Sequence, residues 1–593
     1  MEQIKERITS FFSDERNVLI TLILIGLIFW SYNLNSPLLD FHSWRQTETA
    51  GFARNLYNNG FNIFYPQIDS GGAGPGYVEA EFQLVPFIIA LLYKIFGVHE
   101  YVARLVIIAF SMGSIYLLYK MVRMHYSKRV AIFSTFFFII SPMELFFGRT
   151  VMPESAMIFF SIGSLYFFDK WTEYDDNRSF LFAIICTTLA FLVKIPTLYL
   201  GLPLLWLAYA KYGKRLLFEP KLYLFTIVTL IPPAMWYYFA HSVLAQYNSV
   251  SIWDLGSGSK FASFELLLSP ELYMLLFTRL TFYVFTPVGF LLFIYGLSLK
   301  TKPKDYVFHF WFLAIIIFFF VVARGNIGNN YYQLPLVSAG AVFVGLALSK
   351  IYEKNNMASF GLIAIILLSA IYTVAPFYAQ NTIILSAGNT IDKIVEKDAL
   401  IITTESEIGS NPAILYYSQR KGWTLPGTLW SPSMLDSLKN QGADYFVIAP
   451  QLSLLNNINF STYLFNAYKS VIGSNFVVFD LHEPSDILSS PNQTVMNFKG
   501  SGALIGGYIA EPNNKGILNI TSYYKLMGSK TNYCVLTINF MDLNGNSLLQ
   551  ESFLSSELNP GVIEKNHYVL LIPDEIRPKI SDVQFKVQEL DVQ

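Results

Sequence analysis

The sequence predicts a helical protein that crosses a membrane many times and ends in a soluble part. Hydrophobic residues make up 53% of the 593 residues and charged residues only 14%, whereas soluble domains carry about 25% charged residues. The long apolar runs are confined to residues 17–378, and residues 380–593 have the composition of ordinary soluble protein. The net charge of −1 gives no argument for nucleic acid. We therefore expect the lipid bilayer as a partner and no nucleic acid.

Eleven apolar runs are candidates for spanning helices, because a helix needs roughly 20 apolar residues to cross the bilayer. A further run, residues 81–97, is interpreted as a juxtamembrane or re-entrant helix on the outer side. If it were counted as a span, the basic residues of 120–129 would fall outside, against the positive-inside rule. The candidates are residues 17–34, 103–120, 130–146, 155–170, 180–195, 197–210, 222–243, 280–299, 306–323, 331–349 and 357–377.

The basic residues then form clusters on one side of the membrane, which the positive-inside rule assigns to the cytoplasm. The amino terminus lies on this side, and the carboxyl-terminal part lies outside. No small-residue cleavage site follows the first apolar run, which favours an uncleaved signal anchor. We expect a multi-pass protein of the plasma (inner) membrane. The clusters are Lys5/Arg7/Arg16, Lys120/Arg123/Lys128/Arg129, Lys211/Lys214/Arg215/Lys221, Lys300/Lys302/Lys304 and Lys350/Lys354.

The carboxyl-terminal part alternates strand-like and helix-like segments. Residues 398–404 and 445–449 are typical of buried strands, and residues 411–420 are typical of a helix. This alternation predicts an extracytoplasmic α/β domain at 380–483, after a transmembrane domain at 1–379.

The end of the chain, residues 484–593, is predicted to be an extracytoplasmic β-sandwich domain, because its short β runs are separated by turns. Residues 534–540 and 547–553 flank the turn segment 542–545 and resemble a hairpin. No cluster with catalytic or metal-ligand spacing stands out in either soluble domain. Binding of substrate or a partner is therefore favoured there over chemistry.

The first outer loop begins with a polar and aromatic stretch directly after the first apolar run. Asp40, His42, Trp44 and Arg45 lie within six residues, and ionisable groups at the lip of a membrane are costly and rarely without a role. A serine and a glutamine spaced as a capping box predict a helix here, lying in the membrane interface. Two interpretations stay open. Asp40 is a catalytic carboxylate or a cap of this helix, and Trp44 is a substrate platform or an interfacial anchor.

The same loop continues with a glycine-rich segment, residues 69–76, and two acids. Four glycines within six residues predict a mobile loop and no phosphate cradle, because no P-loop lysine follows. Glu79 and Glu81 alternate, so an extended segment would point both to one side. They bind sugar hydroxyls or an ion, or they are simply solvated.

Three further outward segments carry the other candidate residues. Arg149 and Glu154 precede a predicted span, where a proline-started helix end is the simpler explanation for that loop alone. Lys194 lies at the outer end of another span, and snorkelling would explain it by itself. Cations matched to a phosphate, with carboxylates that accept a proton, nevertheless predict a glycosyl-transfer site on this face. The last segment contributes Arg324, Tyr331, Tyr332 and Gln333.

At these residues the chain resembles the C-type glycosyltransferases that depend on polyprenyl-phosphate sugars, above all the protein O-mannosyltransferase and lipid A aminoarabinose transferase group. The family carries an acid just after its first span, as at Asp40, and an arginine before an acid in the next outer loop, as at Arg149 and Glu154. A Lys-x-Pro at a span end matches Lys194, and a Tyr-Tyr-x-Leu-Pro-Leu segment matches residues 331–336. The order and common sidedness of these motifs, over roughly residues 15–350, carry the resemblance.

The resemblance implies a GT-C-like fold with juxtamembrane helices in the first outer loop. It also implies an inverting transfer of a sugar from a polyprenyl-phosphate donor to an acceptor hydroxyl of a protein, lipid or glycan, outside the cytoplasm. Asp40 would be the general base, and Glu154 would position the acceptor or orient an arginine. His42 would hydrogen-bond to Asp40 or donate to the phosphate. The cations stabilising the phosphate would be Lys194, Arg324 and one of Arg45 and Arg149.

The chain departs from the family pattern at two acids. Many members have a second acid directly after the first, where this chain has Phe41 and His42, and Glu154 stands where an aspartate is common. Both departures put a metal-binding role in doubt, although a divalent metal stays possible as a cofactor.

Two rival hypotheses lie in other functional classes. A transporter or flippase of lipid-linked glycans also needs a cationic outward cavity, but transporters commonly show repeated halves with broken helices, and the sequence shows no internal repeat. A receptor whose soluble part does the binding would leave the Asp40 and Glu154 loops unexplained.

Overall fold

The computed structural model divides the chain into two units. The first comprises residues 1–41, 52–66 and 77–379, and the second comprises residues 42–51, 67–76 and 380–593. Two short segments of the first outer loop therefore belong with the carboxyl-terminal part. The described residues are 14–247, 260–405, 411–473, 475–484, 487–488, 495–497, 503–512, 517–526, 533–555, 563–571, 576, 579 and 582–590.

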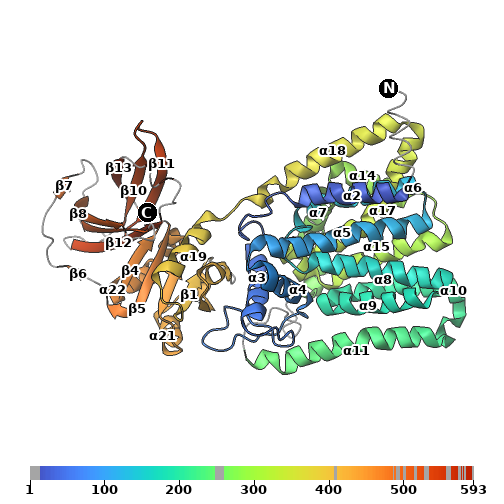
Figure 1. Cartoon of the computed structure of the whole chain (residues 1–593), viewed down its shortest axis with the longest axis horizontal. Coiled ribbons are helices and arrows are strands. Elements are labelled where there is room, and N and C mark those ends of the chain that lie inside the picture. Colours follow the sequence, from blue (N-terminus) through green and yellow to red (C-terminus); the bar gives the residue numbers. More distant parts are fainter. Residues whose placement is uncertain are drawn as a thin grey trace. The chain divides into compact units, whose positions relative to one another are not determined.

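The first unit is a helix bundle in which α2, α5, α8, α9 and α11 run side by side, each packed on the next (Figure 1). Helix α17 lies inside the bundle, and most of its side chains are buried. Helix α3 (Ser43–Asn58) begins in the second unit and ends in the first. The other helices are α2 (Glu15–Trp30), α4 (Leu84–Phe96), α5 (Glu100–His125), α6 (Lys128–Ile140), α7 (Pro142–Phe147), α8 (Glu154–Tyr174), α9 (Asn177–Val193), α10 (Gly201–Tyr212), α11 (Pro220–Ser242), α12 (Phe264–Leu268), α13 (Pro270–Arg279), α14 (Pro287–Leu297), α15 (Val307–Val321), α16 (Ala323–Gly328), α17 (Leu334–Lys354) and α18 (Asn356–Val374).

Helices occur at each predicted span, but not all are long enough to cross a bilayer alone. Among the described residues, five helices have the necessary length and apolar composition, and a sixth is obtained if one bent pair counts as a span. The total of eleven spans therefore stays a prediction. Helix α4 has 13 residues and is about 20 Å long, shorter than the roughly 30 Å hydrocarbon layer, which supports its interpretation as a juxtamembrane helix. The five helical stretches are Glu100–His125, Pro220–Gln246, Pro303–Val321, Asn330–Lys354 and Asn356–Ile394.

The predicted span at 280–299 is not one straight helix. The stretches Pro270–Val284 and Pro287–Leu297 meet at an angle of 101°. The break coincides with Thr286, whose φ of 64° lies in the left-handed region and whose hydroxyl accepts a hydrogen bond from Gly289 N. This hydrogen bond caps the amino terminus of α14, so a new helix begins after the break. The proline that follows Thr286 suits the first turn of a helix. Apolar composition alone did not reveal the bend.

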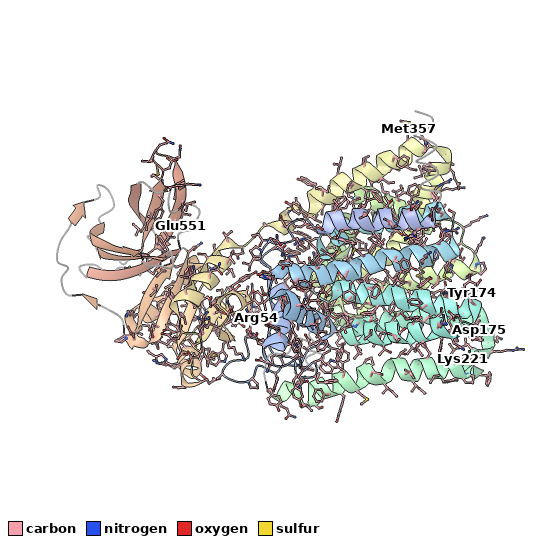
Figure 2. The ribbon with its side chains drawn as sticks, in the orientation of Figure 1. Arg54, Tyr174, Asp175, Lys221, Met357 and Glu551 are labelled. Carbon is pink, nitrogen blue, oxygen red and sulfur yellow. The ribbon has the colours of Figure 1, made fainter. Side chains whose placement is uncertain are left out.

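The labelled charged residues separate along the bundle as the charge pattern predicts. Asp175 and Lys221 lie at one end of the first unit, and Arg54 lies towards the other end (Figure 2). The end that carries Lys221 is the end that the positive-inside rule assigns to the cytoplasm. We refer to it below as the basic end, and its cytoplasmic location stays a prediction.

The second unit is built on a ten-stranded sheet with the order β2-β1-β3-β5-β4-β12-β9-β8-β7 and with β6 beside β12. A three-stranded sheet, β11-β10-β13, completes it. The helices are α19 (Thr382–Ile394), α20 (Ala413–Ser418), α21 (Pro432–Asn440) and α22 (Ile458–Ala467). The strands are β1 (Leu400–Thr404), β2 (Lys421–Thr424), β3 (Tyr445–Ile448), β4 (Tyr468–Gly473), β5 (Phe476–Pro484), β6 (Ile487–Leu488), β7 (Val495–Asn497), β8 (Ala503–Pro512), β9 (Ile517–Leu526), β10 (Tyr533–Met541), β11 (Ser547–Leu554), β12 (Ile563–Leu571) and β13 (Asp582–Leu590).

The sequence interpretation of this unit is right for the elements named here, and its division into two domains stays a prediction. Strands β1 and β3, helix α20 and the antiparallel β10–β11 hairpin occur where they were predicted. Strand β12 pairs in parallel with β4, so the ten-stranded sheet continues across the predicted boundary at residue 483. The two sheets also share a core, to which β10 contributes Leu536 and Ile538. A separate β-sandwich domain therefore stays a prediction.

The glycine-rich segment of the first outer loop is anchored, contrary to the expectation of a mobile loop. Gly72 N donates to Gly422 O at 2.7 Å, and Gly422 N donates to Asp69 O at 3.0 Å. Gly422 belongs to β2, the end strand of its sheet, whose outer backbone groups need partners. Gly72 has a φ of 69°, and a Cβ there would approach the Trp423 ring to 2.7 Å. Glycine permits this close contact, so it serves packing here and not mobility.

The packing of α14 on α17 gives a test of the bundle. A Cβ on Gly296 would lie 1.9 Å from Phe343 O, whereas a Cβ on Gly361 in α18 would meet nothing within 4 Å. Gly296→Ala should lower the free energy of unfolding by about 1–3 kcal/mol through overpacking. Gly361→Ala should leave it unchanged or raise it by up to about 1 kcal/mol. Thermal unfolding in detergent measures both, and equal effects would contradict the packing.

Candidate functional site

The first element of the candidate site is a buried ion pair between Asp40 and Arg149. Arg149 Nη2 donates to Asp40 Oδ2 at 2.6 Å, and both side chains are fully buried. Because removing two charges from water is costly, such a pair persists only with close contact and further stabilising groups. The guanidinium supplies one of them by lying 4.6 Å from the ring centroid of Tyr378, a cation–π distance.

The residue after Asp40 fixes where this acid lies. Phe41 N donates to Phe377 O at 3.0 Å, and the two phenyl rings stack with centroids 4.3 Å apart. Tyr378 in turn donates its hydroxyl to Leu145 O at 3.0 Å. Segments far apart in the sequence therefore hold the carboxylate in one place.

The loop 148–153, between α7 and α8, carries Arg149 and leads directly to Glu154. Its entry is tightly packed, because a Cβ on Gly148 would lie 2.2 Å from Trp30 Nε1. Ser111 Oγ donates to Gly148 O at 2.9 Å, and Ser155 Oγ donates to Phe147 O at 3.1 Å. These contacts fix the loop that connects Arg149 to Glu154.

The second element is Lys194, which contacts two carboxylates. Its Nζ lies 2.9 Å from Glu81 Oε1 and 3.1 Å from Glu154 Oε1. All three side chains are at most 9% exposed. Glu154 Oε2 is buried and has no hydrogen-bond partner among the residues that the structure describes. This oxygen can therefore accept a hydrogen bond from a bound ligand.

Backbone contacts hold the Glu81 segment against the end of α9. Phe82 N donates to Leu192 O at 3.2 Å, and Trp236 Nε1 donates to Ala80 O at 3.2 Å. Lys194 follows α9 in extended backbone conformation, with φ −153° and ψ 105°. The helix thus ends where its next residue can turn towards the two acids.

Ring contacts join the two charged groups into one site. Arg149 lies over the Phe146 ring at 5.5 Å, and Phe147 contacts Tyr331 with ring centroids 6.4 Å apart. Lys194 Nζ lies 5.9 Å from the centroid of Tyr331. Together with the loop 148–153, this aromatic layer places the Asp40 pair and the Lys194 group in the same region.

Glu79 has a partner that the sequence interpretation missed. His241 Nδ1 lies 3.1 Å from Glu79 Oε1, and the His241 side chain is 66% exposed. His241 lies in the last turn of α11, at a predicted outer span end, which was the available signal. Glu79 and Glu81 thus point to different partners and do not form one ligand pair.

An apolar groove is lined in part by the residues that follow Lys194 in the chain. Its volume is about 470 Å³, and Ile195 and Pro196, the two residues after the lysine, line it together with Tyr332. Phe318 of α15 forms another part of the wall, and Lys260 supplies a cation. We call it the η1–α15 groove, after the 3-10 helix η1 (Ile195–Leu200). Sequence reasoning missed it because its walls are formed by residues far apart in the chain.

Several predicted site residues are not brought to these groups. Arg324 is exposed. Gln333 is buried, and its Nε2 donates to Asn326 Oδ1 at 2.6 Å, a contact within the segment 326–333. Arg45 forms an ion pair with Glu48. The remaining two, His42 and Trp44, belong with Arg45 to the second unit, so the structure does not place them beside Asp40.

A metal site has no clear candidate here. Within the described ranges, no group of three His, Cys, Asp or Glu residues has the geometry to hold a metal ion. At the site itself, Glu81 and Glu154 contact the ammonium of Lys194. A requirement for a divalent metal stays open as an expectation.

Residues 83–238 match the family of dolichyl-phosphate-mannose-protein mannosyltransferases. The comparison with curated protein sequences gives no match. The fold is similar to that of ArnT from Cupriavidus metallidurans bound to undecaprenyl phosphate, with a TM-score of 0.57 at 13% identity over 79% of this chain and 98% of that chain. The oligosaccharyltransferase of Archaeoglobus fulgidus in the apo form has a TM-score of 0.50 at 12% identity, covering 97% of this chain and 96% of that chain.

These comparisons confirm the resemblance found in the sequence. The chain has the GT-C-like fold of membrane glycosyltransferases, and residues 83–238 carry the mannosyltransferase family match. At 12–13% identity the structural matches show the fold alone. The roles of individual residues rest on the geometry described above.

The Asp40–Arg149 pair gives a stability test. Arg149→Met leaves a buried carboxylate without its cation and should cost about 3–5 kcal/mol of unfolding free energy. Asp40→Asn should cost less, because the amide oxygen still accepts from the guanidinium. The double variant should be more stable than the sum of the two effects predicts, since neither charge remains. Unfolding of the four full-length proteins in detergent measures this coupling, and additive effects would contradict the pair.

Proposed function

We propose that this protein is an inverting glycosyltransferase of the membrane that moves a sugar from a polyprenyl-phosphate donor to an acceptor hydroxyl on the extracytoplasmic side. The acceptor belongs to a protein, a lipid or a glycan. The observation that carries the proposal is the buried Lys194, which is held by two carboxylates and is followed in the chain by two residues that line an apolar groove. A ligand with an anionic head and a long apolar tail fits this combination.

The η1–α15 groove supports a polyprenyl tail in the donor. Its lining is almost entirely apolar, so it suits an isoprenoid chain that buries hydrocarbon surface. Because Ile195 lines the groove and follows Lys194 directly, we expect the phosphate of a tail bound in the groove to reach the ammonium. ArnT of Cupriavidus metallidurans, with the same fold, has been seen with undecaprenyl phosphate bound.

The charge balance at Lys194 implies a rearrangement when the donor binds. One ammonium beside two carboxylates leaves a net negative charge, which would repel a phosphate. The Glu154 contact is the longer of the two, at 3.1 Å. We therefore expect the phosphate to replace Glu154 at Lys194, which frees this acid to accept a hydrogen bond from the acceptor or the sugar.

The reaction then needs one base and one stabilised leaving group. The acceptor oxygen forms a bond to the anomeric carbon as the bond from that carbon to the phosphate oxygen breaks, on the opposite face of the sugar. Asp40 takes the acceptor proton, and the hydrogen bond from Arg149 fixes the orientation of the Asp40 carboxylate. Lys194 stabilises the charge that develops on the leaving phosphate, which is commonly a large contribution to catalysis.

The assay for this assignment compares Asp40→Asn with the unaltered protein. Transfer of labelled sugar from a polyprenyl-phosphate donor should fall by at least about 10²-fold, the typical contribution of a general base. Donor binding should persist, because Lys194 and the groove are unchanged. Glu173→Gln, which removes an exposed acid paired with Lys304, is the matched control and should keep full activity.

Two outcomes would overturn the proposal in different ways. An Asp40→Asn protein that folds and transfers sugar at the normal rate would remove the base assignment. If the unaltered protein never releases sugar from the donor with any acceptor, but moves the intact donor across vesicles, it is a transporter.

A further inference from the structure

A second apolar groove lies between α10 and α11, and nothing in the proposed reaction uses it. Its volume is about 390 Å³. The groove exists because α10 packs on α8 and α15, whereas α11, the next long helix in the chain, packs on α9. Leu198 of η1 lines both this groove and the η1–α15 groove. We call it the α10–α11 groove.

The polar side chains in its lining are already satisfied by their own helices. Thr226 Oγ1 donates to Leu222 O at 2.9 Å, and Thr229 Oγ1 donates to Phe225 O at 2.8 Å. Thr187 Oγ1 donates to Ala183 O at 2.7 Å. The groove therefore offers hydrocarbon surface to its occupant, and an apolar chain fits it.

One end of the groove lies at the basic end of the bundle. Its wall there is formed by Leu216 and Leu217 of the 3-10 helix η2 (Gly213–Phe218) and by Tyr223 of α11. Tyr223 donates its hydroxyl to Leu217 O at 2.6 Å, which ties η2 to α11. Leu217 is 64% exposed and Phe218 83% exposed, so this turn presents apolar side chains at the surface, as segments at a membrane interface do.

The same turn carries cations, and the nearby acids are mostly compensated. Lys214 and Arg215 are exposed on η2, and Lys221 lies at the start of α11, at the bundle end seen in Figure 2. Asp175 is bound by Lys211 Nζ at 2.9 Å, and this hydrogen bond lowers the pKa of Asp175.

Two other acids lie in the same region. Asp176 accepts the backbone N–H groups of Arg178 and Ser179 as the cap of α9. Glu219, between η2 and α11, is the remaining acid of this turn. It offsets one of the three positive charges, so the groove mouth keeps a positive charge.

We propose that the α10–α11 groove binds an anionic phospholipid, with one acyl chain in the groove and the headgroup at Lys214, Arg215 and Lys221. The charge of the groove mouth favours an anionic lipid over a zwitterionic one. The headgroup of a zwitterionic lipid carries a cation, which the three basic residues would repel. Cations near an anionic lipid surface contribute substantially to such binding. The site lies outside the groove proposed for the donor, so it is tested without reference to sugar transfer.

The experiment measures lipid retention by the full-length protein with native mass spectrometry in detergent. Dioleoyl phosphatidylglycerol is the anionic probe and dioleoyl phosphatidylcholine the zwitterionic one. The anionic lipid should bind about tenfold more tightly. The double variant Lys214→Gln/Arg215→Gln should remove this preference. The double variant Lys300→Gln/Lys302→Gln, which alters two exposed lysines outside the groove lining, should keep it.

A second pair of variants tests the apolar part. Leu205 lines the groove and is 53% exposed, so Leu205→Trp fills it with little effect on folding. This change should weaken binding of phosphatidylglycerol about tenfold through loss of the acyl-chain contact. Leu291→Trp, at a 70% exposed leucine of α14, should not change it.

Three results would overturn the proposal. Equal retention of the two lipids would mean ordinary bilayer contact, and retention unaffected by Leu205→Trp would place the lipid elsewhere. Displacement of phosphatidylglycerol by added polyprenyl phosphate, sensitive to Leu205→Trp, would assign the groove to the polyprenyl tail.

Discussion

The site depends on the loop 148–153, because this one segment connects both buried charge groups. Arg149 at its start holds Asp40 at 2.6 Å, and Glu154 directly after it contacts Lys194 at 3.1 Å. Burying these charges is costly, and the cost is offset only where each charged group lies close to a group of opposite charge. The packing of Gly148 against Trp30 and the serine hydrogen bonds on both sides of the loop keep these two distances fixed. A shift of the loop would disturb the Asp40–Arg149 pair and the Lys194 group together.

This coupling explains how a membrane enzyme can work with few polar groups. The aromatic side chains of Phe146, Phe147 and Tyr331 are buried, and electrostatic interactions are stronger in such a low-dielectric environment than in water. Lys194 contacts this layer at Tyr331, and the two residues that follow it line the apolar η1–α15 groove. The proposed chemistry and the proposed lipid binding would thereby meet near one residue.

The sequence indicated four charged residues that the structure brings together in pairs or groups. Asp40, Arg149, Glu154 and Lys194 were identified because charged residues directly beside apolar runs are unusual, and these four do form the two charge groups. Helix positions also followed from apolar periodicity. Arg324 looked equivalent by the same criterion, but its helix α16 turns the side chain to the surface, which a linear pattern does not show.

Features that arise from packing between distant segments were not predicted. The bend at Thr286 depends on one residue in the left-handed region, and the anchoring of Gly72 depends on an unpaired sheet edge more than 300 residues later in the chain. Sheet continuity between β4 and β12 likewise requires knowledge of strand pairing, which composition does not contain. His241 and Tyr378 joined the site through contacts of this kind.

A structure of the full-length protein with a polyprenyl phosphate bound tests the central claim most directly. The account predicts the phosphate within hydrogen-bonding distance of Lys194 Nζ, about 2.7–3.2 Å, with the isoprenoid chain in the η1–α15 groove and Glu154 released from the lysine. A phosphate bound away from Lys194, with the ammonium still held by both carboxylates, would contradict it.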